Sequence, residues 1–470
     1  MLPLVELQCP IAPQMLMPEL CSPITKTEAA GGKPAWTSVS GGPATGNPAK
    51  EREQMKSMLS RGIAAAIFVA LTASIGLHAQ EFRVFDRNVQ VHGFGTQGFV
   101  HTDANNWLTM ETANVGSGEI TDFGANASVP LFDKVRVGAQ IYEHNVGQLG
   151  KWHPELDWAS ADYKFRSWLG FRGGKVKTAM GLYNDTQDMD ALHVFALLPQ
   201  SIYPIDMRDA TLAHIGGDLY GTIRPEKKLG SFAYTLYGGD RRDSIYGGYP
   251  YNLQMHGISI QKYGGPVVGG DLRWNTPVRG LTAGTSYVYE MITGTGQLNP
   301  SVALGGPDVE VPYKEWSKDD FMNQYYGTWS SRSGKLRVDS EYRRYWRDQD
   351  IFSGAFWITT DTRSWYVGGS YAVNKRLEVG SYYSHFIIDW NCDVPGQVPS
   401  PSVSSPDRHL YDKAVTARIN LKNYWYAKVE GHFMDGYGGF MYPDGFYPQV
   451  NPQGLKPNTN GVVVRTGMYF

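Results

Sequence analysis

Charged side chains occupy almost every second position in the stretch KLRVDSEYRRYWR, residues 335–347. Successive side chains of an extended chain point to opposite faces, so Arg337, Arg343 and Arg347 share one face. A row of guanidinium groups that faces water attracts negative solutes, which is the chemistry of an anion-conducting wall. The alternative is that these cations pair with carboxylates on neighbouring strands and only keep that face hydrated.

A second group of charged side chains lies in the stretch 185–210. Closely spaced carboxylates can bind a hard cation such as calcium, but this stretch lacks the remaining ligand spacing of a calcium loop. A solvated acidic segment is the simpler interpretation. The apolar centre at 194–198 would have no reason to lie on an exposed loop. We therefore expect the segment to fold into the lumen of a channel and to narrow that channel. The charged residues that we expect at this constriction are Asp185, Asp188, Asp190 and Arg208.

Neither catalytic nor metal-binding motifs occur in the sequence. It contains no Gly-x-Ser-x-Gly and no His-Glu-x-x-His motif. Cys392 is the only cysteine after residue 79, which excludes a disulfide within that part of the chain and a cysteine metal site. The net charge of -2 provides no field for nucleic acid. We expect neither an enzyme nor a bound cofactor or metal.

The N-terminal region is typical of a targeting signal. Residues 55–79 combine a short basic start with an uncharged core at 62–77, which is too short to span a bilayer as a helix. We predict a Sec signal peptide that is cleaved before Gln80. Residues 1–54 show no period, and we expect them to be a disordered, non-native extension upstream of the working initiator Met55.

The remainder of the chain, residues 80–470, alternates apolar and polar side chains with period two. Its alternating segments run to about ten residues or more, as in membrane-spanning strands, whereas globular strands average about five or six. Short turns alternate with long polar loops, and we assign 252–265 to a loop. The sequence predicts an all-β transmembrane antiparallel barrel of about sixteen strands, with short periplasmic turns and long extracellular loops. The predicted strands are 89–100, 119–130, 134–146, 155–166, 168–183, 211–223, 230–241, 266–276, 281–292, 319–332, 335–348, 361–373, 376–389, 409–421, 424–436 and 460–470.

These features resemble a known family. The signal peptide, the opening VQVHGFGTQGFV, the sixteen segments and the terminal Phe470 resemble a Gram-negative outer-membrane porin. Residues 169–221, with LGFRGGKVKTAMGLYNDTQD, LLPQSIYPIDMR and GGDLYG, resemble in part the phosphate-selective (O/P-like) class. The resemblance implies a bacterial outer-membrane location in contact with lipid and lipopolysaccharide, and a homotrimer. It also implies that Phe470 is a signal read by the outer-membrane assembly machinery.

The barrel prediction lets the inward side chains be assigned by phase. We expect a bulge at Gly173 and Gly174 that shifts the strand by one residue and turns Lys175 and Lys177 inward. The predicted pore-lining basic residues are Arg136, Arg172, Lys175, Lys177, Arg273, Arg337, Arg343, Arg347, Arg418, Lys428 and Arg465. We expect passive diffusion of small polar solutes with a preference for anions. The alternatives are a sugar-selective porin and a secreted soluble β-protein that binds glycans.

Overall fold

The computed structural model describes the chain from residue 80 to residue 470, with short gaps. The described ranges are 80–84, 87–304, 307–351, 356–393, 405–438 and 445–470. The predicted signal peptide and the predicted upstream extension lie outside these residues.

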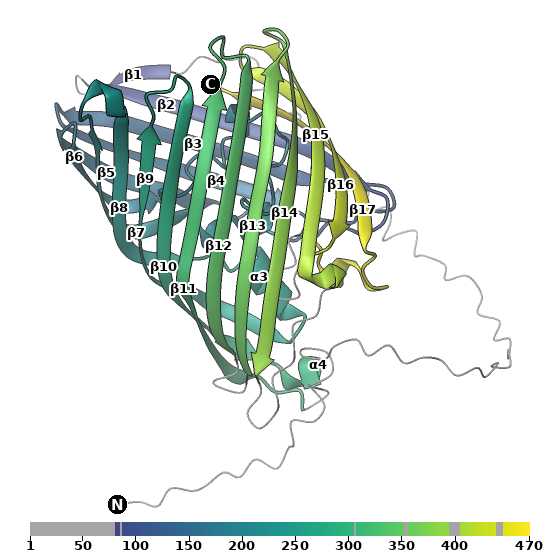
Figure 1. The fold of residues 1–470 in the computed structure, drawn as a ribbon. Helices are drawn as coiled ribbons and strands as arrows, with labels where there is room; N and C mark the ends of the chain where they lie inside the picture. Colours follow the sequence, from purple (N-terminus) through teal and green to yellow (C-terminus); the bar gives the residue numbers. More distant parts are fainter. Residues whose placement is uncertain (1–79, 85–86, 305–306, 352–355, 394–404, 439–444) are drawn as a thin grey trace, which may run out of the picture.

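Sixteen antiparallel strands, β2 to β17, form a closed barrel (Figure 1). Each strand pairs with the next along the chain, and β17 pairs with β2 to close the ring. Closure satisfies the backbone hydrogen bonds of both edges, as a strand in lipid requires. The predicted fold class is confirmed. The bounds are β2 Arg87–Thr102, β3 Ser117–Phe132, β4 Val135–Val146, β5 Glu155–Arg166, β6 Leu169–Lys177, β7 Ala213–Ile223, β8 Ser231–Arg242, β9 Ile258–Asn275, β10 Leu281–Leu298, β11 Val311–Ser330, β12 Leu336–Ile351, β13 Phe356–Ala372, β14 Leu377–Asp393, β15 His409–Lys422, β16 Trp425–Gly436 and β17 Asn458–Tyr469.

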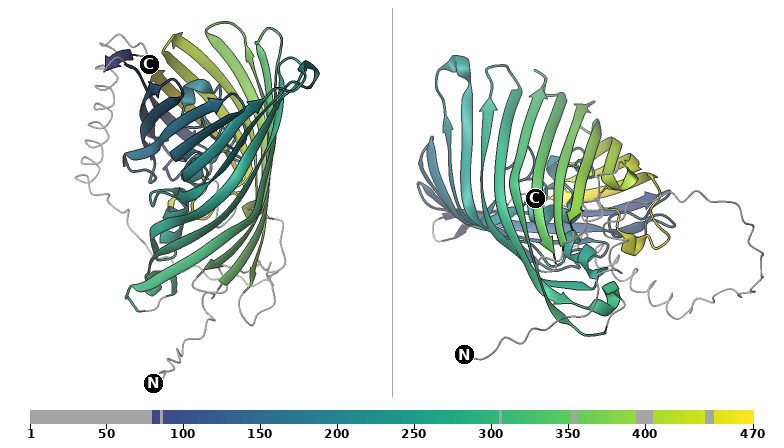
Figure 2. Two further views of the ribbon diagram at one scale, coloured as in Figure 1. Left: turned by 90° about the vertical axis from the view of Figure 1, so that its left-hand side faces the viewer. Right: turned by 60° about the horizontal axis from the view of Figure 1, so that its bottom comes forward.

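Each of the sixteen predicted strands has a counterpart, but several lengths differ. The assignment of 252–265 to a loop is wrong for residues 258–265, which belong to β9. Gly264 and Gly265 interrupt the apolar alternation there, yet both residues pair in register with β8 or β10. Conversely, β6 ends at Lys177, earlier than the predicted residue 183. Strands β9 to β14 are therefore the long side of the barrel, as Figure 2 shows.

A short additional strand, β1 (Gln80–Val84), precedes the barrel and pairs with residues 87–91 of β2. Gln90 pairs with β3 on one side and with β1 on the other, so β1 shares the edge of β2 that β17 occupies. The two strands lie end to end along that edge.

In the described residues, short helical segments lie in the connections between strands. The α-helices of the described residues are α3 (Gly248–Gln254) and α4 (Pro300–Leu304). The segments of 3-10 helix are η2 (Asp190–Leu192) and η3 (Ile205–Ala210) between β6 and β7, η4 (Lys227–Leu229), η5 (Pro406–Arg408) and η6 (Pro448–Val450). Within the described residues no helix has both the length and the apolar character needed to span a membrane.

The outer wall of the barrel is apolar. Val367 of β13, Val415 of β15 and Val429 of β16 are exposed on this wall. Ion pairs interrupt this surface toward the ends that carry the long loops, for example Arg344 with Asp361 at 2.9 Å. An exposed apolar wall of this extent suits lipid rather than water.

The interior contains the buried apolar residues of the molecule. The largest cluster of buried apolar residues lies toward the long loops, and Trp107, Leu108 and Phe446 from these loops are fully buried in it.

Candidate functional site

The connection between β6 and β7, residues 178–212, crosses the inside of the barrel. Its apolar centre packs against the inner wall: Phe195 contacts Tyr382 and Ala414, and Leu198 packs against a cluster that includes Tyr366 of β13. Ala196 and Leu197 belong to the large interior cluster. We call residues 178–212 the inward loop.

A buried ion cluster holds the inward loop to the far wall. The carboxylate of Asp190 lies 2.9 Å from Lys428 Nζ and 3.2 Å from Arg465 Nη1. Lys428 also donates to the carbonyls of Asp190 and Phe195, each at 2.8 Å, and Arg465 donates to the carbonyl of Ala196 at 2.9 Å. Lys428 is fully buried and Asp190 is 7% exposed. Hydrogen-bonded pairs in such surroundings are strongly destabilised when one partner is removed.

Glu430, next to Lys428 on the same inner face of β16, binds the loop through backbone hydrogen bonds. Its carboxylate accepts the N–H groups of Ala196 at 2.8 Å and Leu197 at 2.9 Å. His432 lies between Glu430, at 3.1 Å, and Asp412, at 2.9 Å. Glu430 and His432 are fully buried. This side of the loop is therefore fixed by side chains of β15, β16 and β17.

A second anchor lies at the start of the loop, on β12. Glu341 accepts hydrogen bonds from the Tyr203 hydroxyl at 2.7 Å and from the Leu182 N–H at 3.0 Å. The Tyr183 hydroxyl donates to Asp339. Glu341 is 1% exposed, so this anchor is also shielded from water.

The third anchor joins both ends of the loop to β4 and β5. Arg208 lies 2.5 Å from Asp157, and Lys177 lies 2.6 Å from Asp188. Gln140 donates to Asp157 and also to Asp188. Asp188 and Asp190 are thus buried and paired with cations, so the prediction of a solvated acidic segment is wrong for these two residues. Within the described residues, no group of three or more His, Cys, Asp or Glu could hold a metal ion.

Burial shifts the pKa values of the loop's titratable groups. Burial lowers the pKa of His193 to about 4, so its ring is neutral at pH 7, and its Nε2 lies 2.9 Å from the Thr186 carbonyl. Burial alone would raise the pKa of Asp190, but Lys428 and Arg465 outweigh burial and lower it below its ordinary value. The loop therefore presents an ionised carboxylate to the two wall cations.

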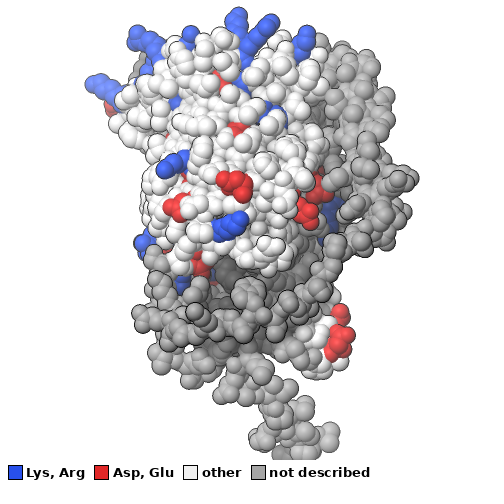
Figure 3. Space-filling model, turned by 90° about the vertical axis from the view of Figure 1, so that its right-hand side faces the viewer, with Lys and Arg blue, Asp and Glu red and all other residues white. Residues whose placement is uncertain are grey.

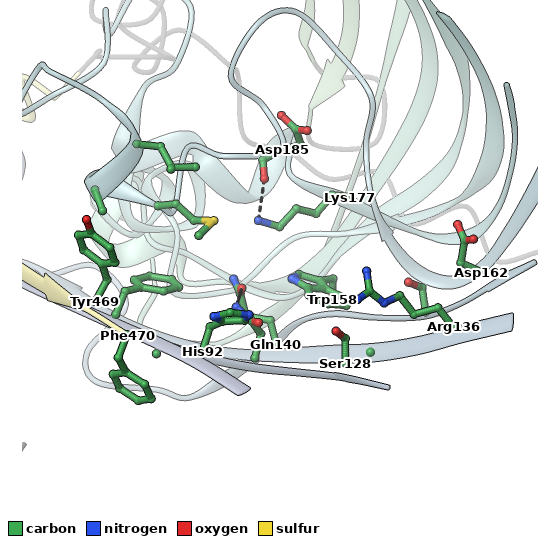
Figure 4. A pocket seen from close by; sticks show the side chains of 18 of the residues that line it. His92, Ser128, Arg136, Gln140, Trp158, Asp162, Lys177, Asp185, Tyr469 and Phe470 are labelled. Carbon is green, nitrogen blue, oxygen red and sulfur yellow. Dashed lines mark hydrogen bonds between the residues drawn. The ribbon is translucent and has the colours of Figure 1, made fainter. Parts of the chain in front are cut away.

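A cavity of about 1790 Å³ lies on the short-turn side of the inward loop (Figure 4). We call it the vestibule. Asp185, Met189 and Leu192 of the loop form one boundary. Eight Lys or Arg residues and three Asp residues line it, so the charge of its wall is positive. The basic residues are Lys134, Arg136, Lys164, Arg172, Lys177, Lys375, Arg376 and Lys422, and the acidic ones are Asp133, Asp162 and Asp185.

Three of the predicted pore-lining residues face the vestibule. Arg136 donates to the Gln90 side chain at 2.6 Å, and Arg172 lies 3.4 Å from Asp162. Lys177 lines the same cavity while it holds Asp188. The remaining vestibule cations come from the turns and strand ends.

Most of the other predicted pore-lining residues bind protein groups. Five of them contact the inward loop, and these are Arg273, Arg337, Arg418, Lys428 and Arg465. Arg347 pairs with Asp319 at 2.5 Å and Glu290 at 3.3 Å, and Arg343 donates to Gln324 at 3.0 Å. The alternation of the sequence places these side chains on the inner face of the barrel. It does not indicate which protein groups occupy the lumen.

The predicted inward orientation of Lys175 is wrong. No bulge occurs at Gly173 and Gly174, because β6 pairs in unbroken register with β7 through both residues. Lys175 lies opposite Ile215, which is 42% exposed on the outer wall, and its Nζ donates to the Leu156 carbonyl. Gly174 has a φ of +128°, and a Cβ there would lie 2.2 Å from a neighbouring carbonyl oxygen. The glycines provide close strand approach rather than a register shift.

The structure also brings together Thr178, His214 and Asp218. Thr178 Oγ1 lies 3.1 Å from His214 Nδ1, and His214 Nε2 lies 3.0 Å from Asp218. This is the order of a nucleophile, a base and an orienting acid. All three are buried, and the adjoining cavity measures about 20 Å³, which is room for about one water molecule. The group therefore has no space for a substrate and serves to join the start of the inward loop to β7.

Phe470 ends the chain as part of the sheet. Its N–H and its carbonyl both hydrogen bond to the backbone of Gly93, at 2.9 and 3.1 Å. Its ring occupies the space of a side chain at Gly93, because a Cβ there would lie 2.5 Å from the ring. The C-terminal residue is thus seated on β2.

No protein-family model and no curated protein sequence matches the chain. Among solved structures it is similar to in-vitro folded OmpT, an outer membrane protein of Vibrio cholerae, with a TM-score of 0.51 and 10% identity over 83% of this chain and 100% of that chain. Outer-membrane expressed OmpT gives a TM-score of 0.50, with the same identity and coverage. The outer membrane channel DcaP of Acinetobacter baumannii gives 0.48, with 11% identity over 83% of this chain and 99% of that chain. The likeness to OmpT shows that the fold is that of outer-membrane β-barrels.

Proposed function

We propose that the protein is an outer-membrane porin that admits small polar solutes and prefers anions. The main support for this proposal is the vestibule, whose wall has eight basic and three acidic residues. Two of the basic residues, Arg172 and Lys177, have carboxylate partners. In the part of the chain that the structure describes, no ion pair involves the other six.

Unpaired cations around an aqueous cavity raise the local concentration of anions and oppose the entry of cations. The cavity is bounded by the inward loop, so a solute that crosses the barrel has to pass this loop. The cations then select the charge of the solute, and the loop limits its size. The partial resemblance to phosphate-selective porins remains a prediction.

A sugar-selective porin is the second candidate. Trp158, Tyr424 and Tyr469 line the same vestibule and offer aromatic faces to a polar ring. A secreted soluble protein is not favoured, because the wall exposes large apolar side chains on neighbouring strands. The Thr178, His214 and Asp218 group does not favour an enzyme, since it is closed to substrate.

The reversal potential of the purified protein in a planar bilayer under a KCl gradient tests the proposal. We expect a potential of the sign for chloride permeation. A cation-selective current would contradict the anion preference, and the absence of current would contradict the pore. A block of the current by an uncharged oligosaccharide, without charge selectivity, would support the sugar-selective candidate instead.

A further inference from the structure

Exposed basic residues surround the end of the barrel that carries the short turns. Each of the seven short turns between strands contains or adjoins at least one of them, from Lys134 between β3 and β4 to Lys422 between β15 and β16. Only Asp133 and Glu226 are acidic and exposed on these turns. We call this set the basic rim: Arg87, Lys134, Arg166, Arg224, Lys228, Arg279, Arg332, Lys335, Lys375, Arg376 and Lys422. Figure 3 shows Lys and Arg projecting from this end.

Part of the basic rim lies beside the lipid-facing wall. Lys134 and Arg166 both lie 5.6 Å from the centre of the Phe165 ring, and Arg87 lies 5.7 Å from that of Phe132. The Phe165 ring is 41% exposed and is not part of the vestibule lining, whereas the Phe132 ring, which is 65% exposed, borders the vestibule. The cations therefore sit at the level of the outward aromatic side chains.

Other outward aromatic residues occupy the same level around the barrel. Trp168, Trp274 and Trp329 are exposed beside the short turns, and the indole of Trp274 donates to the Leu229 carbonyl in the adjoining turn. Aromatic side chains at the ends of membrane strands mark the boundary between hydrocarbon and headgroups. Cations at that boundary lie where lipid phosphates lie.

We propose that the basic rim binds the phosphate groups of anionic phospholipids in the leaflet that faces the periplasm. The proposal rests on the outer-membrane location and orientation of the proposed porin. It adds a second role for basic residues, because Arg166, Arg224, Lys228 and Arg332 are not among the residues that line the vestibule. Lys134, Lys375, Arg376 and Lys422 belong both to the rim and to the vestibule lining, so the test uses rim residues that do not line the vestibule.

Lipid binding to the detergent-solubilised full chain tests the proposal, with native mass spectrometry as the readout. Phosphatidylglycerol is the anionic probe and phosphatidylcholine the zwitterionic one. The rim variant is Arg166→Gln/Arg224→Gln/Arg332→Gln, with one cation removed from each of three turns. The matched control, Arg242→Gln/Lys262→Gln/Lys314→Gln, removes three exposed cations from the opposite ends of β8, β9 and β11.

We expect the wild-type protein to prefer phosphatidylglycerol. The rim variant should bind it about 100-fold more weakly, at about fivefold for each cation removed, and the control should bind it like the wild type. Equal binding of the two lipids by the wild type would overturn the proposal, and so would equal losses in both variants. Competition by soluble glycerol phosphate as strong as by the lipid would assign the rim to free anions instead.

Folding and pore function are read separately from lipid binding. Heat-modifiable migration on a denaturing gel shows whether each variant forms the barrel, and the wild-type comparison of the two lipids stands even if a variant does not fold. The reversal potential of the rim variant should equal that of the wild type. A changed reversal potential with unchanged lipid binding would overturn the division between rim and vestibule, whereas loss of lipid binding alone leaves the proposed pore intact.

Discussion

The substitution Asp190→Asn removes the one loop carboxylate that faces both Lys428 and Arg465. Removing one partner of a buried pair costs about 3 to 5 kcal/mol. Lys428 keeps its two carbonyl acceptors at 2.8 Å, and Arg465 keeps Asp122 at 2.6 Å, so we expect the lower limit. A loss of about 3 kcal/mol in docking raises the undocked population of the inward loop by about 150-fold.

Single-channel recording measures this change, because the loop bounds the vestibule. We expect Asp190→Asn to increase the mean conductance and the open-channel noise, and to lower the urea midpoint of unfolding. The matched control is Asp185→Asn, since Asp185 lies on the same loop but its carboxyl group borders the vestibule. If Asp190→Asn and the control behave alike in both assays, the ion cluster does not hold the loop.

Three further predictions concern the loop and the closure of the barrel. Glu430→Gln places an amide N–H against the loop's N–H groups, so we expect a loss of about 2 kcal/mol in urea unfolding, and an unchanged midpoint would contradict this anchor. Because burial lowers the pKa of His193 to about 4, stability should be complete above about pH 6.5 and fall by about 3 kcal/mol toward pH 4. His193→Gln should flatten that part of the unfolding curve against pH, and an equal slope in both proteins would refute the assignment. Gly93→Val should displace the Phe470 ring and reduce the heat-modifiable fraction of the protein in outer membranes. Deletion of Phe470 should reduce that fraction as well. Normal assembly of both variants would contradict the proposed closure.

Much of the fold was predictable because period two is a local property. The alternation that places Val462 and Val464 outward and Arg465 inward is present in the sequence, and the structure has the same phase. Strand lengths were less predictable. The strand β9 continues through a Gly-Gly-Pro segment that lacks the apolar alternation, because pairing with β8 and β10 keeps this segment in the sheet.

The candidate site was predictable only in part. An inward phase indicates which side chains enter the lumen, but it does not indicate which of them meet the loop. Lys428 and Arg465 were therefore predicted to line the pore, although both bind Asp190 of the inward loop. Glu430 and Glu341 were missed as loop anchors, because backbone N–H acceptors have no sequence signature. A buried apolar segment such as 194–198 was the usable signal, since it required a partner surface inside the barrel.

The most direct test of the central claim compares ion selectivity in two matched variants. The vestibule variant Arg136→Gln/Arg376→Gln/Lys422→Gln removes three lining cations, and Arg242→Gln/Lys262→Gln/Lys314→Gln removes three from the extracellular ends of strands. We predict that under a KCl gradient the reversal potential of the vestibule variant moves toward cation selectivity, while the control retains the wild-type value. An unchanged potential in the vestibule variant, or an equal shift in both, would contradict the assignment of selectivity to the vestibule.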